Sequence, residues 1–595
     1  MITKLKCLFI LCLALSVHGE PSWIFFSDKG YERGSRAEFE AVESAGKSFS
    51  ERCIERRNLR GAGFDFADIP VFHEYIEQIS QTGAELRVVS RLLNAVSVEA
   101  DASILTMIAQ MPFVSRIRPV SSFRRERPFE TYEPSVPSYS NYGSSWTQNN
   151  MLGATKAHKI GLSGRGVLIC ITDTGFKLDH LAMAASEVVS AYDFIDNDSV
   201  VSFEPGDPDP SESHGTMTWS AIGGYYSGEL VGTAYGASFL LARTENYSEE
   251  FPAEEDYWIA AAEWADSAGA DIVSVSLGYS DWYSPDSMTG DIAPISIAAD
   301  LLSQRGVCCV ICSGNYGYEG PVSVTAPGDA DSVITVGACD TYGNRLSFSG
   351  QGPTADGQIK PEVVALGTGV KSAGHSGVAD FRSASGTSAS TPLVAGLTAL
   401  MLESRPELAP MDIRKALIST ASQNELPDNQ IGWGIPNVVS ALSYPIAGRT
   451  AIPVFVGWNL VSLPLSSPVS ADTAFPARIG EVWGWNPSAG EYFEADSIEP
   501  GYAYFVLYDI DTLLLVDGDP LYEVDLGLAP GWHAIGGVAS TNSLASVIAR
   551  SSARIHNGIF VFNKDINNYS LSNRLSPGQG GFILVTGAGS VRLAE

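Results

Sequence analysis

The sequence predicts an α/β protein built on a parallel sheet flanked by helices. A small α+β block precedes the sheet, and a tandem of small all-β modules follows it. The sheet is predicted because, between residues 146 and 445, continuous apolar runs bounded by glycine alternate with runs of helical period. Such runs are typical of strands buried on both faces by crossover helices. The β modules are predicted because residues 447–595 contain short alternating runs, many glycines and prolines, and an internal repeat.

The first 19 residues have the pattern of a secretory signal peptide. Lys4 and Lys6 precede an apolar core at Leu8–Leu15, and small or tolerated residues precede a cleavage position near Glu20. No later apolar run is long enough to span a bilayer. We therefore expect a protein without a transmembrane segment that is secreted, periplasmic or held at the cell surface.

Length and charge limit the classes of function. A chain of 595 residues is expected to fold as three or four domains. The net charge of −31 argues against a nucleic-acid partner, because phosphate binding needs a basic surface. A solvated acidic surface is the simplest interpretation of this charge.

The eight cysteines do not have the spacing of a disulfide framework. Cys7 and Cys12 lie in the signal peptide, and Cys53 lies in the following block. The other five lie in apolar runs predicted to be strands: Cys170, Cys308, Cys309, Cys312 and Cys339. Buried free thiols are favoured over bridges. A zinc site is disfavoured because no histidine accompanies them.

Residues 20–128 form the predicted α+β block, and residues 129–145 form a linker rich in Pro, Ser and Tyr. The patterns predict helices at 75–81 and 103–110, and strands at 86–90, 95–100 and 114–120. The block ends in the basic run Arg124–Arg127. This run is either a processing site or an ordinary charged loop, and the sequence favours neither.

Residues 146–445 form the predicted α/β domain. Buried strands are expected at 166–172, 238–242, 271–277, 307–312 and 333–338, and helices at 257–268 and 292–304. Ligands of such sheets bind at the carboxyl ends of the strands. Side chains that follow these strands are therefore the first candidates for a site.

Residues 447–595 contain two copies of a unit of about 75 residues. Gly457–Leu463 matches Gly531–Gly537, Val482–Asn486 matches Ile559–Asn563, and Pro500–Phe505 matches Pro577–Phe582. We expect a tandem of β modules without strong helices, in which the aromatic residues are core rather than a binding platform. Their role stays open between binding of substrate, glycan or surface and support of stability or secretion.

Three stretches place chemically useful side chains beside glycine at the edges of predicted elements. Asp173 ends the first buried strand, and His214 begins a helix. Ser388 lies just ahead of another helix, whose N-terminus supplies positive potential and free N–H groups. Pro392 is expected in the first turn of that helix, where its missing N–H costs nothing. Taken singly, each stretch also fits a turn, a cap or a core residue.

Taken together, these stretches resemble the subtilisin-like serine peptidases (subtilases, peptidase S8 family), in which the triad has the same Asp–His–Ser order. The likeness covers about residues 150–440. The matching motifs are Asp173-Thr174-Gly175, His214-Gly215-Thr216, Ser276-Leu277-Gly278, Ser313-Gly314-Asn315, Ser347-Phe348-Ser349, Lys360-Pro361-Glu362, and Gly386-Thr387-Ser388 with Pro392 and Ala395-Gly396. Their shared order makes the resemblance specific.

The resemblance implies acyl transfer on polypeptide substrates. Ser388 would be the nucleophile, His214 the general base and acid, and Asp173 the group that orients the histidine. The Asn315 amide and the Ser388 N–H would hold the oxyanion. Ser276, Leu277 and Gly278 would pair with the substrate as an added strand.

The sequence departs from the family pattern at Met217, where many members have a second histidine, and at Leu366, where proline is usual. The family's calcium loops are not recognisable. No cofactor is therefore certain, and structural calcium stays an alternative: Asp193, Asp196 and Asp198 are candidate ligands by charge, although a solvated loop is the favoured interpretation. Thr325 and Ala326 are candidates to border the pocket for the residue before the cut.

The block 20–128 resembles, more loosely, the inhibitory propeptides of this family through Leu93–Val98 and Val114–Ile117. This likeness implies a segment that templates folding, blocks the site and is removed near Arg124–Pro128. The expected partners are polypeptide substrates and the protein's own propeptide, and the enzyme is expected to be a monomer.

Two alternatives stay open. The chain could be a catalytically silent surface or adhesion protein that keeps the fold. It could also be a transpeptidase that uses the same acyl-enzyme.

Overall fold

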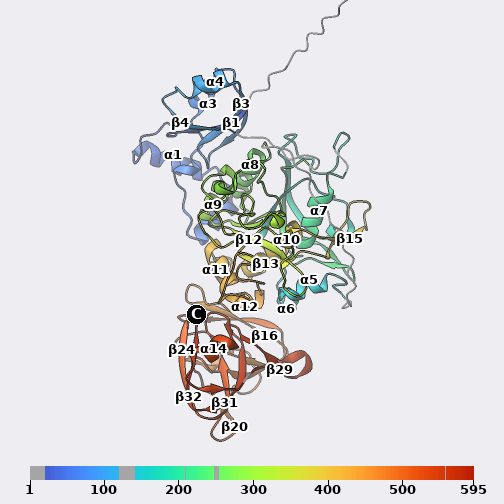
Figure 1. Cartoon of the computed structure of the whole chain (residues 1–595), viewed down its shortest axis with the longest axis vertical. Helices are drawn as coiled ribbons and strands as arrows, with labels where there is room; N and C mark the ends of the chain where they lie inside the picture. Colours follow the sequence, from blue (N-terminus) through green and yellow to red (C-terminus); the bar gives the residue numbers. More distant parts are fainter. Residues whose placement is uncertain (1–19, 120–140, 208–209, 247–252, 557) are drawn as a thin grey trace, which may run out of the picture. The chain divides into compact units, whose positions relative to one another are not determined.

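The computed structural model describes residues 20–119, 141–207, 210–246, 253–556 and 558–595 (Figure 1). The predicted signal peptide, the basic run Arg124–Arg127 and most of the linker lie outside these residues. The chain divides into two compact units. Unit 1 comprises residues 1–47 and 64–122, and unit 2 comprises residues 48–63 and 123–595.

Unit 1 is an antiparallel sheet of order β2-β3-β1-β4 with helices packed on it. The strands are β1 (Glu20–Phe26), β2 (Glu85–Ser90), β3 (Ala95–Ala100) and β4 (Val114–Pro119), and the helices are α1 (Arg36–Gly46), α3 (His73–Ser80) and α4 (Ala102–Ile108). Its core includes Ile24, Val96, Val98 and Ile108, each fully buried. The predicted α+β pattern is confirmed. The sequence patterns do not predict β1, although β1 is a central strand, because its apolar run begins next to the signal peptide.

Unit 2 contains a seven-stranded parallel sheet of order β13-β12-β11-β10-β5-β9-β6. Its strands are β5 (Leu168–Asp173), β6 (Glu187–Asp193), β9 (Ser238–Arg243), β10 (Ile272–Val275), β11 (Cys308–Cys312), β12 (Ile334–Cys339) and β13 (Val363–Leu366). The five predicted strands are confirmed. The patterns miss β6, a sheet-edge strand with mostly exposed side chains, and β13, the four-residue strand at the other edge of the sheet.

Helices cover this sheet on its faces (Figure 1). The longer helices are α7 (Ser213–Gly223), α8 (Ala253–Ala268), α9 (Pro294–Gln304), α10 (Thr387–Ser404) and α11 (Pro410–Thr420), and α5 (Trp146–Met151), α6 (Ala154–Lys159) and α12 (Val438–Leu442) are shorter. Helix α7 packs against α10, and α8 packs against α9. Outside the main sheet, β7 (Tyr225–Tyr226) pairs with β8 (Leu230–Val231), and β14 (Val370–Ala373) pairs with β15 (Phe381–Ala384).

Helix α10 corrects one prediction. It begins at Thr387, so Ser388 lies inside its first turn and Pro392 lies in the helix interior rather than in the first turn. A proline there cannot donate to the carbonyl oxygen four residues earlier, which belongs to Ser388. The Ser276 hydroxyl replaces the missing donor, at 3.1 Å from that oxygen. A tertiary contact therefore makes the interior proline acceptable.

No disulfide joins any two of the six cysteines of the described residues, and all six are buried: Cys53, Cys170, Cys308, Cys309, Cys312 and Cys339. Burial raises the pKa of Cys308 and of Cys339 to about 12. These thiols therefore stay protonated, and unreactive, near neutral pH.

Residues 449–594 form two β modules with the same order of elements, except that the second has one additional short strand, β27 (Arg554–Ile555), after its helix. The first contains β16 (Arg449–Val454), β17 (Gly457–Val461), β18 (Val469–Ser470), α13 (Ala471–Ala474), β19 (Trp483–Asn486), β20 (Glu491–Glu494), β21 (Ser497–Ile498), β22 (Tyr504–Tyr508) and β23 (Thr512–Asp517). The second contains β24 (Glu523–Leu528), β25 (Gly531–Gly536), β26 (Asn542–Ser543), α14 (Leu544–Arg550), β27 (Arg554–Ile555), β28 (Ile559–Asn563), β29 (Asn568–Ser572), β30 (Arg574–Leu575), β31 (Gly580–Gly587) and β32 (Gly589–Ala594). The predicted repeat thus corresponds to a repeated fold, and each copy adds one short helix.

Each β module has its own apolar core, and a smaller cluster joins the two. Leu460 and Ala503 of the first module pack with Ala534 and Phe582 of the second. Four partly buried aromatic side chains pack on this cluster: Trp485, Phe505, Phe560 and Phe562. The repeated aromatic positions therefore contribute largely to contacts within and between the modules.

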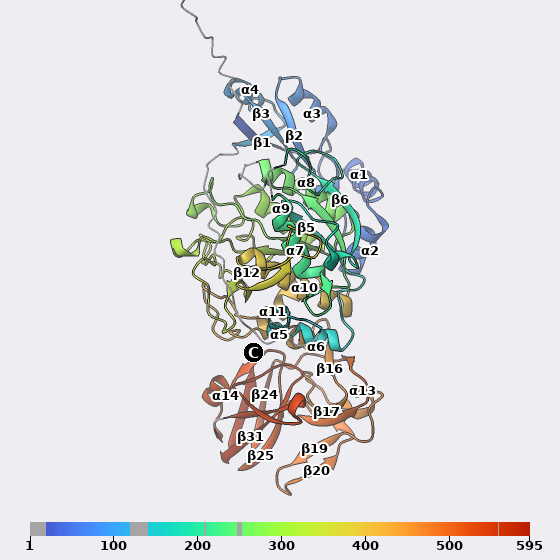
Figure 2. The same ribbon diagram turned by 90° about the vertical axis from the view of Figure 1, so that its right-hand side faces the viewer.

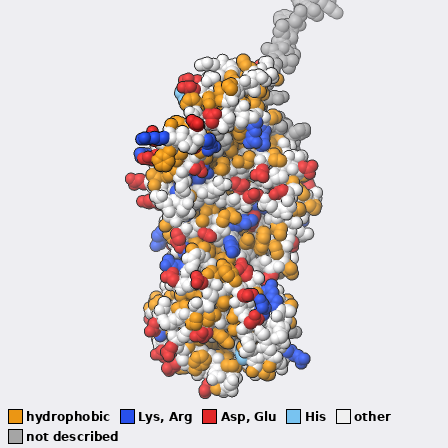
Figure 3. Space-filling view, turned by 90° about the vertical axis from the view of Figure 1, so that its left-hand side faces the viewer, with side chains coloured by type: hydrophobic (Ala, Val, Ile, Leu, Met, Phe, Trp, Pro, Cys, Tyr) orange, Lys and Arg blue, Asp and Glu red, His pale blue; other side chains and the backbone are white. Residues whose placement is uncertain are grey.

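Among the described helices, none is long and apolar enough to cross a membrane. On the face drawn in Figure 3, acidic and basic side chains are interspersed rather than gathered into one patch.

Candidate active site

Asp173 and His214 lie in direct contact at the carboxyl edge of the sheet. Asp173 is the last residue of β5, and His214 is the second residue of α7. His214 Nδ1 lies 2.7 Å from Asp173 Oδ1. Because an ionised carboxylate can only accept, Nδ1 is the nitrogen that carries the proton, and Nε2 is left as an acceptor. The Asp173 side chain is fully buried, whereas that of His214 is 14% exposed.

Two further donors fix the Asp173 carboxylate. The Thr218 hydroxyl donates to Oδ2 at 2.9 Å, and the Thr174 backbone N–H donates to Oδ1 at 2.8 Å. Thr218 lies one helical turn after His214 on α7, so one helix supplies both partners of the aspartate. Sequence reasoning missed Thr218, because its contact becomes visible only once α7 is placed beside β5.

Helix α7 can approach β5 this closely because residue 215 is glycine. A Cβ atom at Gly215 would lie 2.2 Å from the Gly175 carbonyl oxygen and 3.1 Å from Asp173 Cβ. The start of the helix is held by Arg382 of β15, which donates to the Ser213 hydroxyl at 2.7 Å and to the Ser213 carbonyl oxygen at 2.6 Å. Arg382 is a second positioning residue that the sequence patterns do not reveal.

Ser388 is the second residue of α10 and is 7% exposed. Gly386, which precedes the helix, has a φ of +132°, a conformation that residues with a side chain rarely adopt. Within the described residues, no hydrogen bond joins Ser388 to His214. The two residues are brought to the same region because their helices, α7 and α10, pack against each other.

Asn315 follows β11 and is bound to the start of α10. Its Oδ1 accepts from the Thr387 N–H at 2.9 Å and from the Thr387 hydroxyl at 3.0 Å. The amide oxygen is thereby engaged, and the Nδ2 donors stay available. A Cβ atom placed on Gly386 would lie 3.0 Å from Ser388 Oγ and 3.7 Å from Asn315 Nδ2. The serine oxygen and the amide nitrogen therefore border one small space, which the absence of a side chain at Gly386 leaves open.

The segment Ser276–Gly278 continues from β10 and lies beside the start of α10. The Ser276 hydroxyl binds the Ser388 carbonyl oxygen at 3.1 Å, and the Leu277 carbonyl oxygen accepts from Cys312 Sγ at 3.2 Å. Ser276 and Leu277 are both buried, at 7% and 2% exposed. Because β5, β10 and β11 are adjacent parallel strands, all the predicted site residues that follow them meet at one edge.

Thr325 fills the space between Gly278 and Gly314. A Cβ atom on Gly278 would lie 2.1 Å from Thr325 Oγ1, and one on Gly314 would lie 2.6 Å from Thr325 Cγ2. The position of Thr325 is fixed by backbone hydrogen bonds on both sides, from Tyr279 to the Ala326 carbonyl oxygen at 2.7 Å and from Thr325 to the Ser313 carbonyl oxygen at 3.3 Å. The side chain is fully buried.

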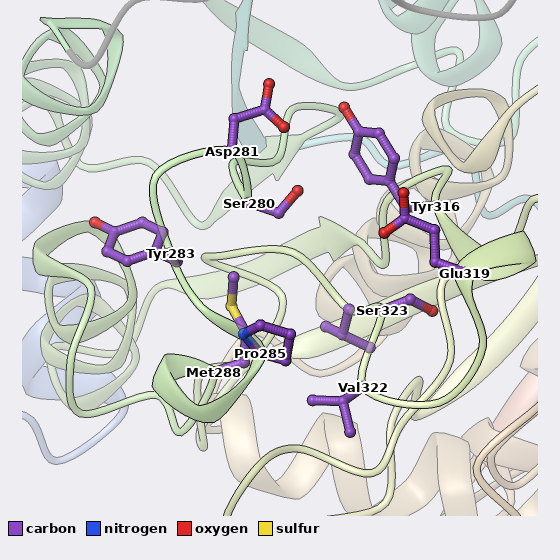
Figure 4. Close-up of a pocket in the computed structure, with 10 residues that line it drawn as sticks. Ser280, Asp281, Tyr283, Pro285, Met288, Tyr316, Glu319, Val322 and Ser323 are labelled. Atoms are coloured by element: carbon purple, nitrogen blue, oxygen red, sulfur yellow. The ribbon is translucent and has the colours of Figure 1, made fainter. Parts of the chain in front are cut away.

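The loops that follow Gly278 and Asn315 line an open pocket of about 360 Å³ (Figure 4). One loop follows Gly278 and contributes Ser280, Asp281 and Tyr283. The other follows Asn315 and contributes Tyr316 and Glu319. Asp281 and Glu319 give part of the lining an acidic character.

Asp193, one of the candidate calcium ligands, is bound to an arginine. Arg243 donates to the buried Asp193 carboxylate at 2.9 Å and to Asp207 at 2.7 Å, and its Nη1 lies 3.7 Å from Asp196. Asp193 Oδ1 also accepts the backbone N–H groups of Ile195 and Asp196. In the described parts of the chain, no group of three or more His, Cys, Asp or Glu side chains is arranged to hold a metal ion.

Comparison with known proteins gives two family matches. A family model described as Subtilase family matches residues 164–434, and one described as Peptidase S8 propeptide domain, Bacteroidota, matches residues 21–132. The second match covers residues 21–47 and 64–122 of unit 1 and residues 48–63 and 123–132 of unit 2.

Individual relatives agree with the family matches. Subtilisin DY of Bacillus licheniformis is 30% identical over 294 residues, which are 49% of this chain and 96% of that protein. Subtilisin Savinase of Lederbergia lenta is 30% identical over 292 residues, which are 48% of this chain and 95% of that protein.

Alkaline serine exoprotease A of Vibrio alginolyticus is 28% identical over 275 residues, which are 46% of this chain and 45% of that protein. The match thus spans less than half of that relative's length. Among solved structures, a cold adapted subtilisin-like serine proteinase matches 47% of this chain and 90% of its own, at 26% identity and a TM-score of 0.38.

Proposed function

The chain belongs to the subtilase family of serine peptidases and carries a propeptide of that family, and we propose that it is a secreted endopeptidase made as a zymogen. In this proposal Asp173, His214 and Ser388 form the catalytic triad. The observation that carries the proposal is the 2.7 Å contact between His214 Nδ1 and the buried Asp173 carboxylate. This contact fixes the tautomer that leaves Nε2 as a base.

In the first half of the reaction, Ser388 Oγ attacks a peptide carbonyl while His214 Nε2 takes the hydroxyl proton. The tetrahedral intermediate then collapses, and His214 returns the proton to the leaving amine, so that an acyl-enzyme remains on Ser388. In the second half, a water molecule attacks the acyl-enzyme while His214 takes its proton, and His214 then returns the proton to Ser388 Oγ. The carboxylic acid product is released. Asp173 stays ionised throughout and stabilises the imidazolium that forms on His214.

The developing oxyanion would be held by the Ser388 backbone N–H and the Asn315 amide. The engaged Oδ1 of Asn315 supports this role, because it orients the amide and leaves Nδ2 beside the small space at Gly386. The N-terminus of α10 adds favourable potential at the same point. Loss of one such donor lowers kcat by about 10²–10³-fold in serine peptidases.

The substrate would lie extended along Ser276–Gly278 and pair with this backbone as an added strand. The catalytic chemistry uses only groups of the chain, so no cofactor takes part in the reaction as proposed. We assign residues 146–445 to the peptidase domain and residues 20–128 to a propeptide that is removed near Arg124–Pro128. In this assignment residues 1–19 are the signal peptide and residues 447–595 are the appended β modules.

A serine-directed fluorophosphonate tests the assignment. We expect stoichiometric labelling of the native protein at Ser388, identified by peptide mass spectrometry, and no labelling of Ser388→Ala. Ser390→Ala is the matched control, because Ser390 lies on the same helix and, within the described chain, donates to the Thr387 carbonyl oxygen at 2.9 Å rather than to a group of the proposed triad. Labelling that persists in Ser388→Ala, or that is absent from the native protein, would refute the role of Ser388.

The same experiment distinguishes the enzyme from a silent protein that keeps the fold, which would not be labelled. Hydrolysis and transpeptidation are distinguished by digesting a peptide in the presence of an added amine. Free carboxylate products indicate hydrolysis, and amide products indicate transfer.

A further inference from the structure

Residues 48–63 belong to the compact unit of the peptidase domain, although the chain before and after them forms unit 1. They contain helix α2 (Glu51–Leu59), which is labelled in Figure 2. The Ser50 hydroxyl caps this helix by accepting from the Cys53 N–H. Four arginines lie in and just after this helix: Arg52, Arg56, Arg57 and Arg60. All four bind the peptidase domain.

Arg56 and Arg57 share one buried carboxylate. Arg56 Nη2 lies 2.5 Å from Asp266 Oδ1, and Arg57 Nη2 lies 2.7 Å from Asp266 Oδ2. The side chains of the two arginines and of the aspartate are at most 2% exposed. Arg56 also donates to the Ala270 carbonyl oxygen at 2.6 Å. Buried charges are tolerated when they are paired and hydrogen-bonded in this way.

Arg52 and Arg60 share a second carboxylate. Both pair with Asp271, and for Arg60 the distance is 2.7 Å. Arg52 Nε donates to the Gly269 carbonyl oxygen at 3.0 Å, and Arg60 Nη1 donates to the Gly306 carbonyl oxygen at 2.6 Å. The contact is therefore made of carboxylates and backbone carbonyl groups on one side and guanidinium groups on the other.

The peptidase domain has features that fit it to this helix. Helix α8 ends at Ala268 with Asp266 in its last turn and has no basic residue there, so an acidic side chain faces the negative end of the helix. The arginines of α2 supply the missing positive charge. Gly269, at φ +91°, makes room for them, because a Cβ atom there would lie 2.7 Å from Arg52 Cγ and 2.8 Å from the Cys53 backbone nitrogen.

This contact lies at the edge of the sheet opposite the catalytic edge. Asp271 precedes β10, and its carboxylate also accepts the N–H of Leu168, the first residue of β5. Asp173, at the other end of β5, belongs to the candidate triad. A strand of this length spans about 20 Å, so the arginine contact is remote from the substrate site.

We propose that Asp266, Asp271 and the carbonyl groups of Gly269 and Ala270 form a second docking site for the propeptide. This site binds residues 48–63 at the edge remote from the catalytic groups. It would retain the propeptide after cleavage of the linker without occupying the substrate cleft. The inference rests on the proposed function only in assuming that the linker is cleaved during natural maturation. A cut made at an engineered site tests it even if Ser388 proves not to be the nucleophile.

The test uses the full chain with Ser388→Ala and a site for an unrelated protease placed in residues 129–140. After cutting, the release rate of the N-terminal fragment is followed by size exclusion and by a fluorophore at its end. We expect Arg56→Gln with Arg57→Gln to release the fragment about 10²–10³-fold faster, because the buried Asp266 carboxylate loses both of its guanidinium partners. Arg36→Gln is the control, since Arg36 is 91% exposed and pairs only locally with Glu40.

Release of the double variant within threefold of the parent rate would overturn the proposal. Where the double variant does not fold before cutting, as judged by circular dichroism and melting, hydrogen exchange of the cut parent protein decides. Protection of the amides of residues 53–60 and 265–270 after cutting supports the second docking site. Exchange at the rate of an unstructured peptide refutes it.

Discussion

The Ser276 hydroxyl donates a 3.1 Å hydrogen bond to the Ser388 carbonyl oxygen, the acceptor that Pro392 cannot serve. This contact fastens the segment proposed to pair with substrate to the helix that carries the proposed nucleophile. The Ser276 side chain thus joins the two parts of the site directly.

Ser276→Ala should lower both stability and activity. The variant leaves the buried Ser388 carbonyl oxygen without a donor, at a cost of about 1–3 kcal/mol in the free energy of unfolding. We expect kcat/KM to fall about tenfold through misplacement of the nucleophile. Urea unfolding of the inactive Ser388→Ala form and peptide kinetics measure the two effects. Ser284→Ala, an exposed serine of the following loop, should change neither, and an unchanged unfolding midpoint in Ser276→Ala would contradict the prediction.

Ser388→Ala should abolish turnover, with a loss of about 10⁶-fold in kcat, while the protein still folds. If maturation is autocatalytic, the precursor should also persist uncut near Arg127. Mass spectrometry of the termini of the purified native and variant proteins provides the measurement. Normal processing of the variant would rule out self-cleavage but would leave the peptidase assignment untouched.

Thr325→Gly should widen the preference for the residue before the cut. The native side chain fills the space between Gly278 and Gly314, so we expect the native enzyme to favour small residues such as alanine there. Removing it should raise kcat/KM for a phenylalanine substrate relative to its alanine counterpart by about 10–100-fold. Thr325→Ser, which loses only a methyl group, should give an intermediate ratio. An identical ratio in all three proteins would show that Thr325 does not limit the pocket.

Glu255 of α8 should make the protein less stable as the pH rises from about 4.5 to about 8. Burial raises the pKa of Glu255 to about 8, although the Trp282 and Tyr283 side chains donate to it and act in the opposite direction. Because the folded pKa is above the unfolded one, the folded state binds more protons between about pH 4.5 and 8. The free energy of unfolding should therefore fall by roughly 1.4 kcal/mol per pH unit over this window.

Glu255→Gln should remove this slope. The comparison requires urea unfolding of the Ser388→Ala protein and of the double variant at pH 6 and pH 9. The difference in the free energy of unfolding between the two proteins should change in favour of the glutamine variant between pH 6 and pH 9. Parallel pH dependences would mean that Glu255 does not titrate in this range.

The sequence predicts the parts of the site that lie on strongly patterned elements. The apolar run of β5 and the glycines beside Asp173, His214 and Ser388 are enough to place these side chains at the ends of buried elements. Strand β6 is missed because an exposed edge strand carries too little periodic signal.

Other features depend on tertiary partners that no local pattern contains. Thr218 and Arg382 have ordinary sequence surroundings, and their contacts exist only once α7 and β15 are assembled. Pro392 is misplaced by sequence reasoning for the same reason, since the donor that replaces its N–H comes from Ser276. The arginines of α2 bind Asp266 and Asp271, which lie more than 200 residues further along the chain, so no local pattern reveals the contact.

The described cysteines are buried and no disulfide joins any two of them, so noncovalent contacts hold the described part of the fold together. Assembly of this part consumes no oxidant and needs no thiol-exchange catalyst. A reducing agent should therefore leave the described part of the protein folded. Its stability should be the same in a reducing compartment as in an oxidising one.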